Sequence, residues 1–108
     1  MNQNAVDFAQ TIADPAVVVL DVRTPDEYIS GHISGAINID INGESFDSQV
    51  SDLDRQKSYA IYCRSGVRSV TAMNRMSQLG FNSFYHLTDG ILDWVSSGQP
   101  VVSLRDSE

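Results

Sequence analysis

The chain has 108 residues, 42% of them apolar and 19% charged, which is enough for one compact domain and too few for two. Its formal net charge of −7 disfavours nucleic acid and acidic membranes as partners, because both are bound through clustered Lys and Arg. The single cysteine excludes an internal disulfide and a multi-cysteine zinc site. The two histidines have no ligand spacing, so we expect neither a metal nor another cofactor.

The sequence shows no targeting signal. No stretch approaches the roughly 20 apolar residues of a membrane span, and the N-terminus lacks the basic and then apolar pattern of a signal peptide. We therefore expect a cytoplasmic protein with no membrane contact, while a removed leader would leave the same sequence. A small acidic domain spanning residues 1–108 is expected to be a monomer, with frayed ends at 1–4 and 105–108.

Helical and strand patterns alternate along the chain. In chain order we expect a helix over 5–13, a strand over 16–20, a helix over 25–31, a strand over 36–39, a weak helix over 44–53, a strand over 58–62, a helix over 67–79, a strand over 84–87 and a helix over 90–97. The run 16–20 is β-branched without alternation, as in a strand buried on both faces. The helix over 25–31 has Thr24 as its cap and Glu27 three residues later.

This alternation predicts an α/β fold with a central parallel sheet and helices on both faces. In such folds, sites form at the carboxyl ends of strands, and Cys63 stands at that end of the strand over 58–62. Apolar residues recur every three positions in the next helix, which predicts a buried stripe. They are Val67, Val70, Met73, Met76 and Leu79.

Cys63 opens a short loop that leads into a helix. Backbone N–H groups at such a turn and the positive end of the helix stabilise negative charge. Two of the seven basic residues, Arg64 and Arg68, add positive charge to the same segment. We therefore expect the thiol to ionise below its usual pKa of roughly 8.5 and to act as a nucleophile.

These features together resemble the single-domain rhodaneses, a family of sulfurtransferases. The resemblance rests on the following segments, in this order: Asp21-Val22-Arg23, Glu27-Tyr28, Gly31-His32-Ile33, Gly35-Ala36, Asn38, the active loop Cys63-Arg64-Ser65-Gly66-Val67-Arg68-Ser69, and Leu87, Gly90, Ile91 and Trp94. The chain departs from the family pattern in two places. Only residues 1–3 remain for the usual edge strand, and Asp89-Gly90 stands where two glycines are common.

The resemblance implies a transfer of sulfur in two displacements. The Cys63 thiolate attacks the outer sulfur of a small anionic donor such as thiosulfate and becomes a persulfide. Substrate-binding positions carried over from the family are Arg64, Ser65, Gly66, Val67, Arg68 and Ser69. Arg68 is expected to line the loop, with a salt bridge on the helix face as its alternative, and Arg64 to face solvent and tune donor choice.

A thiol, cyanide or a protein cysteine would then accept the sulfur. Because the chain has no second cysteine, the acceptor must be another molecule. One alternative is a persulfide carrier or partner-binding module without physiological turnover. Another is a cysteine phosphatase or arsenate reductase, but those families place five residues between cysteine and arginine, whereas four stand here.

Other polar residues are interpreted as structural. Arg23 is expected to pair with Glu27 beside Asp21, and His32 to bond backbone groups. Met73, Met76 and Trp94 are assigned to the core. The acidic stretch over 47–54 is expected to be a solvated face, with docking of a basic acceptor protein as the alternative.

Overall fold

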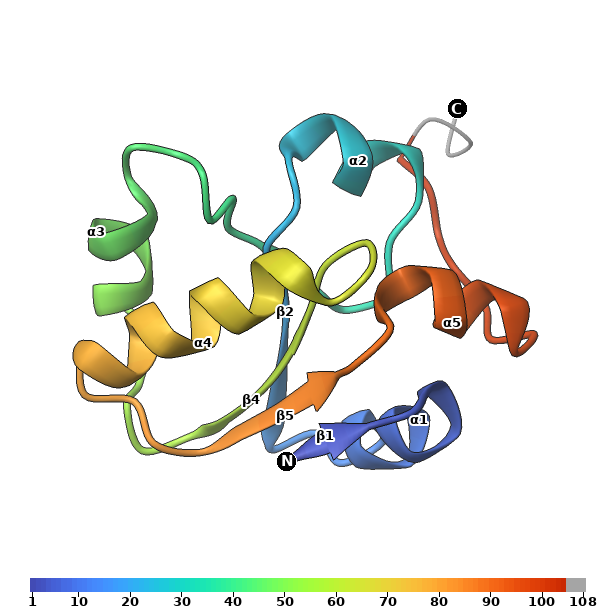
Figure 1. The fold of residues 1–108 in the computed structure, drawn as a ribbon, viewed down its shortest axis with the longest axis horizontal. Helices are drawn as coiled ribbons and strands as arrows, with labels where there is room; N and C mark the ends of the chain where they lie inside the picture. Colours follow the sequence, from blue (N-terminus) through green and yellow to red (C-terminus); the bar gives the residue numbers. More distant parts are fainter. Residues whose placement is uncertain (105–108) are drawn as a thin grey trace.

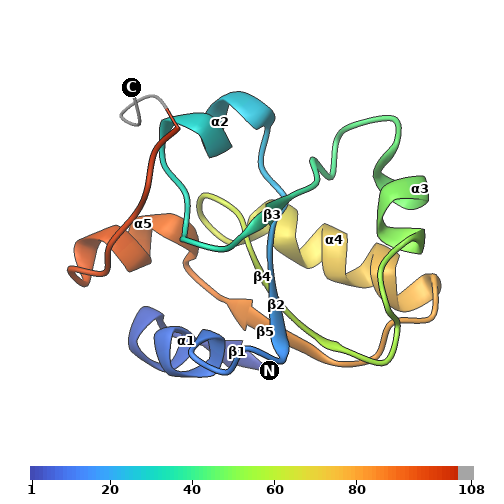
Figure 2. The ribbon, with the colours of Figure 1, turned by 180° about the vertical axis from the view of Figure 1, so that it is seen from behind.

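The strand segments form one sheet in which every paired strand is parallel to its neighbours (Figures 1 and 2). The computed structural model describes residues 1–104. The strands are β1 (Asn2–Gln3), β2 (Val17–Asp21), β3 (Ile37–Asn38), β4 (Ser58–Tyr62) and β5 (Phe84–Leu87), in the spatial order β1-β5-β4-β2-β3. β4 is therefore the central strand, and its carboxyl end carries Cys63.

Two helical layers cover the sheet, which confirms the predicted α/β architecture. The helices are α1 (Ala5–Ile12), α2 (Pro25–Ser30), α3 (Phe46–Ser51), α4 (Val67–Gln78) and α5 (Gly90–Ser96). One buried cluster joins the sheet to α3 and α4, and a second joins it to α1 and α5. In Figure 1 these two helix pairs lie on opposite sides of the strands.

The N-terminal edge of the sheet differs from the expected frayed end. Asn2 pairs with His86 and Gln3 with Leu87, so the short edge strand is present. Asn4 follows as the cap of α1, and its side-chain oxygen accepts the N–H of Asp7 at 2.8 Å. The expectation of fraying is therefore wrong for residues 2–4, while the expected tail at 105–108 lies outside the described residues.

The predicted stripe on α4 is only partly correct. Met76 is fully buried and Met73 partly buried, but Val67 is 74% and Val70 44% exposed. The reason is geometric: a step of three residues turns about 300°, so each successive position falls about 60° behind the last. The buried face instead follows Ser69, Ala72 and Met76. Trp94 is buried as predicted.

This difference predicts unequal costs of truncation on α4. Met76→Ala should destabilise the protein by about 2–5 kcal/mol, because it opens a cavity in the core. Val70→Ala should cost less, no more than about 1 kcal/mol, because 44% of the residue is already exposed. Urea unfolding of both variants measures this. Equal costs would contradict the assignment of the buried face.

Candidate active site

Cys63 lies directly beyond the central strand, beneath the loop that leads into α4. Only 1% of the residue is exposed. The N–H of Gly66 donates to Sγ at 3.1 Å, and the hydroxyl oxygen of Ser69 lies 3.4 Å from Sγ. The sulfur is thus enclosed by the loop and by the first turn of the helix.

Two glycines let this loop lie against the turn between β5 and α5. Gly66 has φ 104°, and a Cβ on it would be 1.9 Å from the carbonyl oxygen of Thr88. Gly90 has φ 68°, and a Cβ on it would be 2.1 Å from the carbonyl oxygen of Arg64. No side chain fits at either position. Asp89, which stands where the family often has glycine, has an ordinary φ of −104°.

The beginning of α5 holds the same loop by hydrogen bonds. The N–H of Ile91 donates to the carbonyl of Cys63 at 2.9 Å, and the N–H of Leu92 donates to that of Arg64 at 3.2 Å. The loop carbonyls are therefore turned toward α5. This leaves loop N–H groups to face the sulfur.

The loop favours the ionised form of the thiol. Burial alone would raise the pKa of Cys63, but the Ser69 hydroxyl and the backbone N–H groups of Ser69, Gly66 and Ser65 outweigh it. The net effect is a pKa below the usual value, as predicted. The site therefore favours a thiolate at Cys63 more than an ordinary cysteine environment does.

Arg68 forms a salt bridge, which is the alternative predicted from the sequence for this residue. Its guanidinium donates to both oxygens of Glu27 on α2, at 2.7 and 2.9 Å. The hydrogen bond from Arg68 is the main reason that the pKa of Glu27 falls to about 2. Two carboxylate oxygens therefore already occupy the guanidinium, and its role in donor binding stays a prediction.

Arg23 has a different partner from the one predicted. It donates to Asp21 at 2.7 Å and to the carbonyl of Gly31 at 2.7 Å, and Tyr62 donates its hydroxyl hydrogen to the same Asp21 at 2.7 Å. The predicted pair with Glu27 is wrong because Asp21 is two residues away at the strand end. The network is buried and ties β2 to β4.

The sequence matches one family model across most of its length. A model described as the Rhodanese-like domain covers residues 4–97. The chain belongs to the rhodanese-like family. The resemblance found from the separate segments is thereby confirmed.

Relatives of this rhodanese-like chain carry different names. A sulfurtransferase of Allochromatium vinosum is 32% identical over 97 residues, which are 89% of each chain. A tRNA uridine(34) hydroxylase of Teredinibacter turnerae is 35% identical over an alignment of 103 positions, and the match covers 90% of this chain and 32% of that protein. The chain thus spans about a third of the hydroxylase. A rhodanese-related crystal structure from Thermoplasma volcanium superposes with TM-score 0.81 and 40% identity, covering 94% of this chain and 96% of that one.

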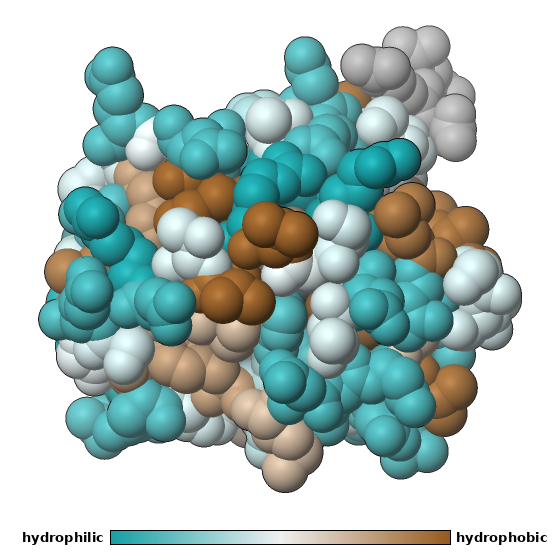
Figure 3. All heavy atoms as spheres, viewed as in Figure 1, coloured by the Kyte–Doolittle hydropathy of each residue, from teal (hydrophilic) through white to brown (hydrophobic). Residues whose placement is uncertain are grey.

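The outer side of the rhodanese-like loop exposes both polar and apolar side chains. Arg64 and Ser65 are exposed, as expected for Arg64, and Val67 is among the most exposed apolar residues. Figure 3 shows apolar surface over the beginning of α4. A molecule that approaches the loop therefore meets a cation and an aliphatic side chain.

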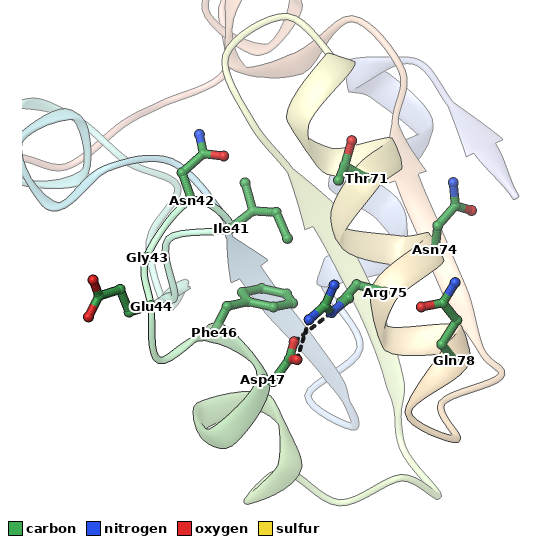
Figure 4. A pocket seen from close by; sticks show the side chains of 10 residues that line it. All are labelled: Ile41, Asn42, Gly43, Glu44, Phe46, Asp47, Thr71, Asn74, Arg75 and Gln78. Atoms are coloured by element: carbon green, nitrogen blue, oxygen red, sulfur yellow. Dashed lines mark hydrogen bonds and ion pairs between the residues drawn. The ribbon is translucent and has the colours of Figure 1, made fainter.

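A polar cavity of about 350 Å³ lies farther along α4 (Figure 4). Its walls come from the segment before α3 and from one side of α4, and an Arg75–Asp47 ion pair closes one end. Asp47 belongs to the stretch predicted to be a solvated face. Asp52 and Asp54 are exposed as predicted.

His86 was not predicted as a functional residue. Its Nε2 lies 2.6 Å from the hydroxyl oxygen of Ser69, which in turn faces Cys63. The sequence held one indication of this contact. The predicted strand that carries His86 comes directly after the helix that follows Cys63, and in a parallel sheet such a strand usually lies beside the strand that precedes the helix. His32 is structural as predicted, with Nδ1 2.6 Å from the carbonyl oxygen of Tyr28.

Two further features of residues 1–104 bear on ligands. No three His, Cys, Asp or Glu side chains in this range gather closely enough for a metal ion. None of its helices combines the length and apolarity needed to cross a membrane.

The Glu27–Arg68 pair predicts a pH-dependent stability. Because the pKa of Glu27 is lowered from 4.5 to about 2, the pair stabilises the fold fully above about pH 5 and loses this effect as the pH falls through 2. Both side chains are about a quarter exposed, so Glu27→Gln should cost about 1–2 kcal/mol at pH 7. Urea unfolding between pH 7 and 2 should show this difference shrinking toward low pH. Asp26→Asn, an exposed neighbour on α2, is the control, and a pH-independent difference would refute the assignment.

Proposed function

We propose that this rhodanese-like domain is a sulfurtransferase that carries a sulfane sulfur on Cys63 from thiosulfate or a persulfide to a thiol, cyanide or protein acceptor. The main support is the buried sulfur that faces the Gly66 N–H and Ser69 and has a lowered pKa. The sulfurtransferase name of the Allochromatium vinosum relative is consistent with this chemistry.

The first displacement forms a persulfide. A lone pair of the Cys63 thiolate attacks the outer sulfur of thiosulfate, the sulfur–sulfur bond of the donor breaks, and sulfite leaves with that electron pair. The new terminal sulfur is anionic. The loop N–H groups that now lower the pKa of Cys63 are placed to stabilise it by preorganised hydrogen bonds.

The second displacement returns the thiolate. An acceptor thiolate or cyanide attacks the terminal sulfur, and the bond to Cys63 Sγ breaks with its electron pair left on Sγ. The burial of Cys63 favours acceptors that reach into the loop. A carrier role that delivers the persulfide to a protein partner is the second candidate, and it is favoured by the exposed Val67 and Val70 beside the loop.

The two arginines differ in the net charge that they offer a donor. Glu27 balances the charge of Arg68, whereas Arg64 is exposed at the loop. We therefore assign attraction of the anionic donor mainly to Arg64, and to Arg68 both a smaller electrostatic effect and the link between α4 and α2. Cytoplasmic location and a monomeric state stay predictions.

Persulfide formation is directly testable by intact mass. After thiosulfate treatment the protein should gain one sulfur atom, a thiol reductant should remove it, and Cys63→Ser should gain nothing. Ser77→Ala, an exposed position farther along α4 and outside the loop, serves as a loading control. If neither thiosulfate nor a low-molecular-weight persulfide loads Cys63 in the folded protein, the sulfurtransferase proposal is wrong.

Donor attraction by Arg64 should appear in kinetics. Arg64→Ala should raise KM for thiosulfate about fivefold at low salt with little change in kcat, because a single exposed charge contributes on the order of 1 kcal/mol. The effect should shrink at high salt and be absent with an uncharged alkyl persulfide. Arg75→Ala, which removes an ion-paired charge farther away on α4, is the control. Equal KM changes for both donors would contradict an electrostatic role.

A further inference from the structure

A chain of hydrogen-bonding groups runs from the nucleophile to the edge of the sheet. Cys63 Sγ lies 3.4 Å from Ser69 Oγ, which lies 2.6 Å from His86 Nε2, and His86 Nδ1 lies 3.2 Å from Asn2 Oδ1. The strands β1, β5 and β4 lie side by side, and Asn2 is the register partner of His86. The sheet therefore places Asn2 beside His86, and the first turn of α4 brings Ser69 between His86 and Cys63, so the four groups form one row.

Ser69 is the branch point of this row. Its hydroxyl has one hydrogen and three neighbouring groups: the Cys63 sulfur, the Gly66 carbonyl oxygen at 3.1 Å and the His86 nitrogen. The contact with His86 is the shortest of the three. Whether the hydroxyl supports a thiol or a thiolate depends on where that hydrogen points.

The imidazole of His86 is the group in the row that can change between donor and acceptor without moving. It is 3% exposed, and burial and the Met1 amino group lower its pKa, against the opposing effects of the Gly66 carbonyl and Asp89. A neutral imidazole has one donor and one acceptor nitrogen, and its tautomer decides which faces Ser69. Arg64 and Arg68 are the charged groups on the loop side of Cys63.

We propose that His86 is a positioning residue for the Cys63 nucleophile: acting through the Ser69 hydroxyl, it directs that hydroxyl's hydrogen toward the sulfur when the sulfur is ionised. This extends the sulfurtransferase proposal, on which its functional meaning rests.

Two arrangements of hydrogens satisfy the row. With a thiol, S–H donates to Ser69, the Ser69 O–H donates to Nε2, and Nδ1–H donates to the Asn2 oxygen. With a thiolate the row holds one proton fewer, which has been released to solvent: Nε2–H donates to Ser69, the Ser69 O–H donates to the sulfur, and Nδ1, now without a hydrogen, accepts from the Asn2 amide. The Asn2 amide accommodates both, because it presents an acceptor or a donor to Nδ1 after a flip. In the second arrangement, the bond from His86 polarises the Ser69 O–H and strengthens its support of the thiolate.

A cycle of variants tests this coupling without any sulfur transfer. The pKa of Cys63 is measured from the pH dependence of its alkylation by iodoacetamide, in wild type, His86→Asn, His86→Gln, Ser69→Ala and the double variant His86→Asn/Ser69→Ala. A glutamine amide extends to about the position of Nε2, whereas an asparagine amide reaches only that of Nδ1. Circular dichroism and thermal unfolding establish that each variant is folded.

We expect His86→Asn to raise the pKa of Cys63 by about one unit, which lowers the thiolate fraction about tenfold at a pH below the pKa. His86→Gln should restore most of that fraction. In the Ser69→Ala background, His86→Asn should have no further effect. His32→Gln, at the chain's other histidine, should leave alkylation unchanged because that residue bonds Tyr28 instead.

A measurement on the wild type covers the case of a variant that fails to fold. The imidazole 15N shifts of His86 should change with the apparent pKa of Cys63. This response should be lost when Cys63 is replaced by Ser. The proposal is overturned if the pKa of Cys63 is unchanged in folded His86→Asn. It is also overturned if His86→Asn shifts that pKa equally with and without the Ser69 hydroxyl, or if the 15N shifts of His86 do not change when Cys63 ionises. Because none of these readouts uses a sulfur donor, a failure here is distinct from a failure to form the persulfide.

Discussion

The close contact between the Cys63 loop and the turn before α5 is the constraint on which the site depends. Two carbonyl oxygens occupy the space that a side chain would need at Gly66 and Gly90. Once the carbonyls of Cys63 and Arg64 are bonded to the first N–H groups of α5, the peptide planes of the loop are fixed. The Gly66 N–H, two residues farther along the loop, donates to the sulfur at 3.1 Å. The acidity of the thiol thus depends on the Ser69 hydroxyl together with the packing of the loop backbone.

The charged groups around the sulfur have different roles. The Ser69 hydroxyl and the loop N–H groups stabilise the thiolate at contact distance, and Arg68 interacts with it only as a smaller Coulombic effect. Arg68 instead ties α4 to α2 through Glu27, which links the active loop to the first half of the chain. Its charge is largely neutralised there. The protein as a whole carries a net charge of −7 and repels anions, so the exposed guanidinium of Arg64 is the group at the loop that attracts an anionic donor.

The sequence predicted the features that local patterns determine. Caps, stop residues and apolar runs located β4 and β5 with their observed bounds, and α1, α2, α4 and α5 to within one residue at each end. The sequence was a weaker guide to which charged side chains pair with each other. Arg23 and Glu27 are close enough in sequence to pair, and only the tertiary placement of α2 near the first turn of α4 lets Glu27 bind Arg68 and leaves Arg23 to Asp21. His86 was missed because its role depends on the neighbouring strand.

The position of His86 also explains why a one-cysteine site benefits from a third residue. The sulfur must be anionic to attack the donor, and it must leave as an anion when the acceptor attacks the persulfide. The loop N–H groups keep the same direction at every stage. The Ser69 hydroxyl can turn its hydrogen between the sulfur and His86 Nε2, so its support follows the charge. His86, able to give or take a hydrogen at Nε2, keeps that hydroxyl hydrogen-bonded in either orientation. Because the charge on Sγ changes between the two displacements, a hydrogen bond that can be redirected, from Ser69, is useful in addition to the fixed ones from the loop N–H groups.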